Sequence, residues 1–319
     1  MKRVLLTGGT GFVGANLARR LLQIGHEVHL LVQPGHTTWR IEALQTDLRL
    51  HEVDLADGER LGNLVRRIGP DWVFHLAAHG AYSWQRDLGQ MVRTNILGTM
   101  NLVGACVATG FEGFVNTGSS SEYGFKDHAP AETEALEPNS YYAVTKSSAT
   151  LFCRYTAQSR QLRLPTLRLY SIYGPWEEPG RLLPTLVSRG LDGGLPPLAD
   201  PDTARDYVHV DDAVEAYLLA VSQADQPPDG IYNIGSGVQT SLRELVEVAR
   251  RVLELSVEPA WGAMPGRSWD TNVWVADNRR AAEVLGWRPK LTIEEGFRRL
   301  VAWFKDNPAL HERYRAGHA

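Results

Sequence analysis

The chain has 319 residues, of which 33 are Lys or Arg and 37 are Asp or Glu, so its formal net charge is −4. This charge gives no field that would attract nucleic acid or an anionic membrane, and no apolar run reaches the ~18 residues of a membrane span. Cys106 and Cys153 are too few for a disulfide framework, and the chain enters a strand-like run at Val4 with no room for a signal peptide. We therefore expect a cytoplasmic protein with one large or two modest domains.

The first apolar run, residues 4–6, is followed by three spaced glycines and then by a helical pattern over 12–22. In this order Gly8 permits a tight turn, Gly11 lets the backbone approach a pyrophosphate, and Gly14 allows the helix to pack against the strand. A turn before an ordinary helix is the alternative, but the order is typical of a dinucleotide-binding unit. The amides expected to face the phosphates at the helix N-terminus are those of Phe12, Val13 and Gly14.

Short apolar runs continue to alternate with helical patterns along the first half of the chain. The expected strands are 4–7, 28–32, 48–53, 72–76, 114–117 and 165–169, and the expected helices are 12–24, 59–68, 85–109 and 141–161. Because parallel strands that are buried on both faces read as continuous apolar runs, the alternation predicts right-handed βαβ units. The fold class is therefore α/β, with a doubly wound parallel sheet of the Rossmann type.

The end of the second expected strand bears on the choice of cofactor. Dinucleotide folds that prefer NAD usually place Asp or Glu there, where the carboxylate binds the ribose 2′-hydroxyl. That position is Val32, so no carboxylate repels a 2′-phosphate. Gln33 follows, and Arg40 could hold a 2′-phosphate in a bidentate contact, although a solvated loop charge is an equally good reading. The sequence favours NADP(H), with NAD(H) as the alternative.

Tyr142 and Lys146 lie four residues apart in a helix-compatible run, so both side chains are expected on one face. A tyrosine ordinarily has a pKa of about 10, which is too high for efficient proton exchange at neutral pH. We expect the Lys146 cation to lower the pKa of Tyr142 by favouring the phenolate. The pair follows Ser119 by 23 residues. This order predicts a proton-transfer centre next to the dinucleotide site.

After residue 170 the sequence changes in character. Pro, Gly and Trp crowd residues 174–180 and 193–201, which predicts irregular loops that shape a cleft. A helix over 211–223 and a strand over 230–234 are expected to return to the sheet. We therefore expect a dinucleotide-binding domain over 1–170, joined by 206–235, and a smaller substrate-binding lobe formed mainly from 171–319.

These motifs together resemble the short-chain dehydrogenase/reductase superfamily, in its extended branch that acts on nucleotide sugars. The likeness runs from Val4 to about Phe304. It includes Ser119, four residues before a Tyr-Gly pair. It also includes Arg-Asp-Tyr-x-His-Val-Asp-Asp over 205–212, Tyr-Asn-Ile-Gly-Ser-Gly over 232–237 and Leu-Gly-Trp-x-Pro over 285–289.

The resemblance implies that Ser119, Tyr142 and Lys146 are catalytic, with Ser120 as the alternative serine. Ser171 stands where relatives usually carry an Asn that contacts the diphosphate, and Arg267 suits a loop salt bridge as well as a substrate contact. The implied cofactor contacts, besides the glycines and first-turn amides, are Gln33, Arg40, Asp54, Leu55, Leu76, Ala77, Ala78, Asn95, Tyr142 and Lys146. The implied substrate contacts are Ser120, Ser171, Arg205 and Arg267, and no metal site is predicted.

The branch includes 4-epimerases, 4,6-dehydratases, decarboxylases and 4-keto-sugar reductases. Dehydratases place Asp-Glu directly after the catalytic Thr, where this chain has Ser120 and Ser121, and residues 118–124 resemble the loop of GDP-4-keto-6-deoxymannose reductases. We predict reduction at C4 of a nucleotide-linked 4-keto-6-deoxyhexose, with Tyr142 as proton donor. The alternatives are an NAD-dependent 4-epimerase and a non-catalytic cofactor-sensing protein. By resemblance, a homodimer through 85–109 and 141–161 is expected.

Overall fold

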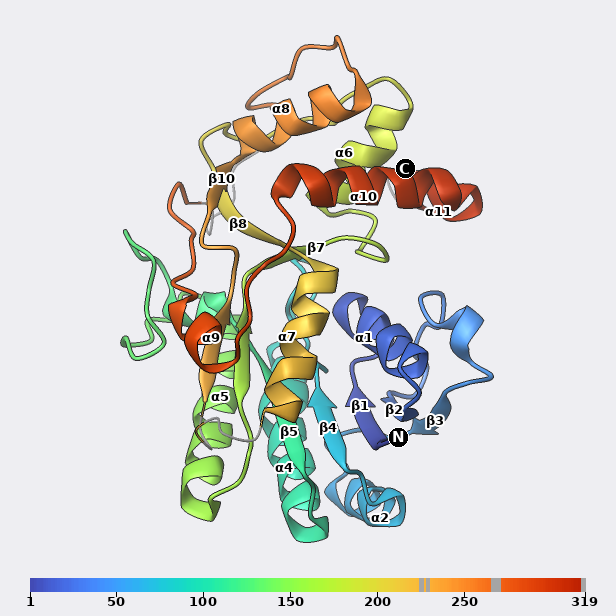
Figure 1. Cartoon of the computed structure of the whole chain (residues 1–319), viewed down its shortest axis with the longest axis vertical. Coiled ribbons are helices and arrows are strands. Elements are labelled where there is room, and N and C mark those ends of the chain that lie inside the picture. The colour runs from blue at the N-terminus through green and yellow to red at the C-terminus, as the bar shows by residue number, and fades with distance from the viewer. Residues whose placement is uncertain (224–226, 228–229, 265–270, 317–319) are drawn as a thin grey trace.

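The computed structural model describes residues 1–223, 227, 230–264 and 271–316. Its main sheet has seven strands, all parallel, in the order β3-β2-β1-β4-β5-β6-β9 (Figure 1). The strands are β1 (Arg3–Thr7), β2 (Glu27–Val32), β3 (Arg49–Glu52), β4 (Trp72–His75), β5 (Gly113–Ser119), β6 (Thr166–Leu169) and β9 (Ile231–Ile234). The prediction of a doubly wound α/β fold is confirmed.

Helices cover both faces of this sheet, because successive strand residues point to opposite sides. On one side Val4 and Leu6 share an apolar core with α1 (Phe12–Gln23) and α7 (Val210–Ser222). On the other side Leu5 packs with α2 (Gly58–Ile68), α4 (Gly98–Thr109) and α5 (Tyr141–Arg160). The near-continuous apolar strand runs in the sequence follow from this burial on both faces. Two short 3-10 helices, η1 (Glu42–Leu44) and η3 (Ser120–Tyr123), complete this half of the chain.

The helix expected over 85–109 begins later and is not uniform. It starts with α3 (Leu88–Met91), whose N-cap Asp87 accepts a hydrogen bond from the Gln90 amide. A π-helical turn, η2 (Val92–Leu97), separates α3 from α4. Such turns carry an extra residue per turn and are frequent at functional sites. The expected helix therefore exists from residue 88, with a local change of winding around Asn95.

A second, three-stranded sheet has the order β10-β8-β7 and contains β7 (Ser171–Tyr173), β8 (Ala204–His209) and β10 (Gln239–Ser241). Four helices lie together with it at the top of Figure 1 and share their own apolar core: α6 (Leu182–Leu191), α8 (Leu242–Leu253), α10 (Ile293–Asp306) and α11 (Pro308–Ala316). The stretches 174–181 and 192–203, which are fully described, contain neither helix nor strand.

The return to the large sheet differs from its expected bounds. Residues 206–209 belong to β8 in the small sheet, so the returning segment begins with α7 and ends with β9 beside β6. In addition α9 (Arg279–Val284) contacts β9, and Trp287 lies in the core of the large sheet, where its indole donates to the Asp212 carbonyl at 2.8 Å.

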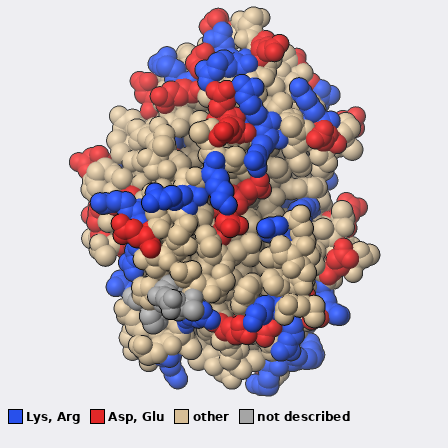
Figure 2. All heavy atoms as spheres, in the orientation of Figure 1, with Lys and Arg blue, Asp and Glu red and all other residues tan. Residues whose placement is uncertain are grey.

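The surface carries charges of both signs. Figure 2 shows Lys and Arg side chains interspersed with Asp and Glu over the face that is drawn. In the described part of the chain, no helix is both long and apolar enough to pass through a bilayer. Cys106 and Cys153 are both buried and unpaired, in α4 and α5.

We expect Gly14→Ala to destabilise the fold. A Cβ at Gly14 would lie 2.3 Å from the Gly8 carbonyl oxygen, a backbone atom that cannot swing aside. Overpacking of this kind costs about 1–3 kcal/mol. A Cβ at Gly62 in α2 meets no atom within 4 Å, so the control Gly62→Ala is expected to gain about 0.5–1 kcal/mol from helix propensity. Urea unfolding of both variants checks this. Equal stabilities would contradict it.

Candidate active site

Strand β5 and helix α5 bring the three predicted catalytic residues together. Ser119 is the last residue of β5, and its side chain is hydrogen-bonded to the Tyr142 phenol in the first turn of α5. That turn is fixed by Ser140, whose hydroxyl accepts from the Ala143 amide at 3.2 Å. One turn further, the Lys146 ammonium donates to the carbonyl of Thr117 on β5. The expected helical spacing therefore places a serine, a phenol and an ammonium at the carboxyl end of one buried strand.

The expected effect of Lys146 on Tyr142 is not what the structure shows. Burial raises the pKa of Tyr142 to about 12, and the hydrogen bond with Ser119 lowers that pKa by less. The ionisable groups that act most on the phenol are Glu122, Tyr82 and Arg181, and not Lys146. Burial also lowers the pKa of Lys146, whose ammonium is bound to the Thr117 carbonyl. The phenol is therefore neutral at pH 7 in this state.

The glycine-rich turn forms an open cradle at the start of α1. Gly8 has a φ of +71°, and a Cβ there would lie 2.5 Å from the Leu76 carbonyl carbon, so only glycine allows this approach between the ends of β1 and β4. Gly11 is the N-cap of α1 and offers no side-chain acceptor to the amides of Phe12, Val13 and Gly14. Amides without a cap at the start of a 12-residue helix suit a pyrophosphate. The residues present fit a dinucleotide.

Arg40 is neither a solvated charge nor a loop cation open to a 2′-phosphate. Its side chain is 6% exposed, its Nη2 lies 2.6 Å from Oε2 of Glu178, and its Nε donates to the Trp176 carbonyl at 2.7 Å. Val32 is buried at the end of β2, and Gln33 is exposed just beyond it. The predicted contact between Arg40 and a 2′-phosphate would therefore have to replace an existing ion pair.

The remaining predicted cofactor residues lie around the ends of β3 and β4. Asp54 accepts from the Ala56 amide at 2.9 Å and pairs with Arg93 at 3.0 Å. Asn95, in the π-helical turn, exchanges two 2.8 Å hydrogen bonds with the backbone of His79 and donates to the Thr145 hydroxyl, next to Lys146. Asn95 thus ties the loop after β4 to α5. That loop begins with Leu76, Ala77 and Ala78, and Leu55 follows Asp54.

On the substrate side, two predicted residues approach Trp274, which the sequence analysis did not single out. Ser120 lines a cavity of about 10 Å³ with Tyr170 and Trp274, and the Arg205 guanidinium lies 5.6 Å from the centre of the Trp274 ring. Ser171 is half-buried at the start of β7. Arg267 falls outside the described residues. No local motif marks Trp274, since only the folding of 271–278 brings it to the serine loop.

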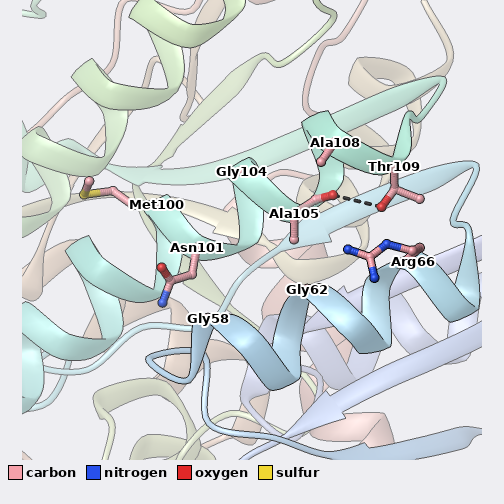
Figure 3. A pocket seen from close by; sticks show the side chains of 9 residues that line it. All are labelled: Gly58, Gly62, Arg66, Met100, Asn101, Gly104, Ala105, Ala108 and Thr109. Atoms are coloured by element: carbon pink, nitrogen blue, oxygen red, sulfur yellow. Dashed lines mark hydrogen bonds between the residues drawn. The ribbon is translucent and has the colours of Figure 1, made fainter.

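A larger cavity lies elsewhere. It has a volume of about 300 Å³ and lies between α2 and α4, where Figure 3 shows Gly58 and Gly62 facing Gly104, Ala105 and Ala108. None of the predicted catalytic, cofactor or substrate residues lines it. This cavity is a groove between two helices that carry small residues, and it is separate from the predicted centre.

We expect the Tyr142 phenol to remain un-ionised at pH 10 in the cofactor-free protein, where an ordinary tyrosine would be half ionised. The folded-state pKa of about 12 lies above the ordinary value. The stability that this group contributes is therefore complete below pH ~10 and is lost as the pH rises toward ~12. The ultraviolet difference spectrum between the wild type and Tyr142→Phe checks this. A phenolate signal from Tyr142 below pH 9 would contradict the burial effect.

Comparison with known proteins agrees with this geometry. Residues 4–235 match the model of the NAD dependent epimerase/dehydratase family. A UDP-glucose 4-epimerase of Mycolicibacterium smegmatis is 31% identical, over 95% of this chain and 99% of that protein. A GDP-6-deoxy-D-mannose reductase of Pseudomonas aeruginosa is 27% identical, over 94% of this chain and 96% of that one.

Solved structures of other proteins also resemble this chain over nearly its whole length. A UDP-glucose 4-epimerase of Thermotoga maritima, solved with UDP-glucose, has a TM-score of 0.86 and 28% identity, covering 96% of this chain and 99% of its own. A dTDP-glucose 4,6-dehydratase of Streptomyces venezuelae, solved with NAD, has a TM-score of 0.85 and 28% identity, covering 98% and 99%. The chain therefore belongs to the NAD dependent epimerase/dehydratase family, the extended short-chain dehydrogenase/reductase enzymes that act on nucleotide sugars.

Proposed function

We propose that the protein reduces the C4 ketone of a nucleotide-linked 4-keto-6-deoxyhexose, with Tyr142 as proton donor. The observation that carries this proposal is that the hydroxyl of Ser119 and the half-buried phenol of Tyr142 lie together at the carboxyl end of β5, with Lys146 one turn further along α5. A ketone oxygen that gains hydride on its carbon needs a donor at that moment, and a neutral phenol is such a donor. The Ser119 hydroxyl gives a second hydrogen bond to the same oxygen and orients it.

The residues around this pair suit the rest of the reaction. The amides of Phe12, Val13 and Gly14 would bind the pyrophosphate of the cofactor, and Lys146 would hydrogen-bond the nicotinamide ribose. When bound, the nicotinamide cofactor supplies the hydride. The Arg205 guanidinium, half-buried beside Trp274, suits the diphosphate of the substrate, and Ser120 and Ser171 suit its sugar and phosphate oxygens.

Loss of water from the sugar, the dehydratase reaction, is disfavoured by the residues after Ser119. Ser120 and Ser121 carry no carboxylate. Glu122 is fully buried, and its two oxygens accept hydrogen bonds from the Ser119 amide at 2.8 Å and from Arg168 at 2.9 Å. A carboxylate held in this way does not face the substrate as an acid or a base.

A 4-epimerase is the second candidate, favoured by the likeness to the epimerases of M. smegmatis and T. maritima. Epimerisation needs the same three residues, but it starts by removing a proton and retains its cofactor through the cycle. A third reading, a cofactor-sensing protein without turnover, gives no reason for the contact between Ser119 and Tyr142. Release of tightly held NAD on denaturation, with interconversion of C4 epimers, would identify an epimerase.

For the cofactor we place NAD(H) first. The preference for NADP(H) was expected from the missing carboxylate at Val32 and from Arg40, and Arg40 is paired with Glu178. The S. venezuelae dehydratase was solved with NAD. NADP(H) remains the alternative, because Val32 brings no carboxylate to the site of a 2′-phosphate.

We also propose that the protein forms a homodimer through α4 and α5. Val144, Leu151 and Tyr155 are 44%, 52% and 70% exposed along one face of α5, and Met100 on α4 is 43% exposed. Apolar side chains of this size at helical spacing suit burial against a second copy.

We expect Tyr142→Phe to lower kcat for the reduction about 10²- to 10⁴-fold, since it removes the proton donor and leaves the ring in place. Tyr141→Phe is the matched control: Tyr141 is the preceding residue, 68% exposed, and its loss should leave kcat unchanged. Activity is measured as NAD(P)H oxidation with a panel of 4-keto nucleotide sugars, and the product is identified by NMR. A fully active Tyr142→Phe enzyme would refute the proposal.

We expect Glu178→Gln to improve the affinity for NADPH relative to that for NADH by about tenfold. The substitution removes the partner of the Arg40 guanidinium, which can then make one charge-assisted hydrogen bond to the 2′-phosphate that only NADPH carries. Arg40→Ala is expected to leave the NADPH-to-NADH affinity ratio unchanged. Glu42→Gln, an exposed acid two residues after Arg40, is the control. Fluorescence titration of each protein with both cofactors tests this. Loss of NADPH affinity in Arg40→Ala would instead show that Arg40 contacts the 2′-phosphate.

A further inference from the structure

We propose that Glu122 is a positioning residue, whose buried carboxylate joins Ser119 on β5 to the helix that carries Tyr142 and Lys146. This inference rests on the proposed function, since it assigns Glu122 a role in aligning those three residues.

One oxygen of Glu122 connects the two halves of the centre. Oε1 accepts from the Ser119 amide at 2.8 Å and from the Thr150 hydroxyl at 2.9 Å. Thr150 lies one turn after Lys146 and two turns after Tyr142, on the same face of α5. A single carboxylate oxygen therefore links the Ser119 backbone to α5, in addition to the contact between Lys146 and the Thr117 carbonyl.

The other oxygen is held by the sheet. Oε2 of Glu122 accepts from Nε of Arg168 on β6 at 2.9 Å, and both side chains are at most 2% exposed. Nη1 of Arg168 donates to the Tyr123 hydroxyl at 2.7 Å, and that hydroxyl donates to Asn233 on β9 at 2.7 Å. A buried ion pair adds little net stability, and such groups are best attested as devices that specify one arrangement.

The charge of Glu122 also reaches the proton-transfer pair. It raises the pKa of Tyr142 and the pKa of Lys146, although burial lowers the pKa of Lys146 overall. The other ionisable groups that interact with the phenol are Tyr82, Arg181 and Tyr217, and those that interact with the ammonium are Cys153 and His75. Among these groups Glu122 is the one that acts on both members of the pair.

Three variants separate position from charge. Glu122→Gln keeps the shape and removes the charge, Glu122→Asp keeps the charge and shortens the reach, and Thr150→Val removes the link to α5 alone. All three are expected to lower kcat about 10- to 100-fold, because small misplacements of reacting groups have effects of that size. We expect KM to stay within about twofold, since Glu122 does not touch the substrate.

The pH profile distinguishes Glu122→Gln from the other two. Reduction needs a protonated Tyr142, so activity falls as the pH rises through the pKa of Tyr142. Loss of the carboxylate charge leaves Arg168 uncompensated and favours the phenolate of Tyr142. The alkaline limb of the plot of activity against pH therefore moves to lower pH by about one unit. In Glu122→Asp and Thr150→Val the limb should stay in place. A folded Glu122→Gln enzyme with wild-type kcat and an unmoved limb would overturn the proposal.

A readout without turnover keeps this test apart from the proposed function. If the wild type reduces no 4-keto nucleotide sugar, the proposed function fails. The ionisation of Tyr142 can still be followed with pH, as the ultraviolet difference spectrum between each protein and its counterpart carrying Tyr142→Phe. Glu122→Gln should then ionise Tyr142 at lower pH than the wild type does. If Glu122→Gln does not fold, as judged by near-ultraviolet circular dichroism, the other two variants decide: wild-type kcat in both would overturn the proposal.

Discussion

Burial of charge at the carboxyl end of β5 is the constraint on which the rest of the centre depends. Ser119, Glu122 and Lys146 are at most 8% exposed, so each polar group there needs a partner inside the protein. The ammonium of Lys146 binds the Thr117 carbonyl, and the carboxylate of Glu122 is shared between the Ser119 amide and Arg168. Since each contact fixes two elements at once, β5, β6 and α5 determine one another's positions.

Much of the large sheet was predictable because the burial of each strand and helix leaves a pattern of apolar residues within that segment itself. A strand buried on both faces must be apolar throughout, and a helix over a sheet must repeat its apolar residues, so β1, α1, β4 and β5 are visible in the sequence. The π-helical turn was not predictable, since no residue type specifies it. Helix α10 carried a readable signal that was missed: Thr292 and Glu295 form a capping box before the apolar residues Phe297 and Leu300.

In the site, too, the features set by local sequence were predictable and the features set by distant contacts were not. Motif spacing placed Ser119 near Tyr142, because helix geometry and the parallel sheet leave little choice. The contacts that the sequence could not supply are those with distant partners. Arg40 is paired with a glutamate 138 residues away, and Glu122 with an arginine 46 residues away. The pKa of Tyr142 is set first by burial, which exists only after folding, and the cation four residues away has less effect than the sequence suggested.

The contacts of Arg40 also limit how relatives of this chain could be recombined. Arg40 stands between β2 and β3, whereas Glu178 and Trp176 lie in the loop that leads to α6. A chimera that kept residues 1–170 and took the remainder from another family member without an acid at position 178 would leave a buried guanidinium with no counter-charge. Exchange of the segment after residue 170 is therefore restricted by an ion pair that has one residue on each side of the junction. Matching that pair is a condition for joining the two segments from different family members.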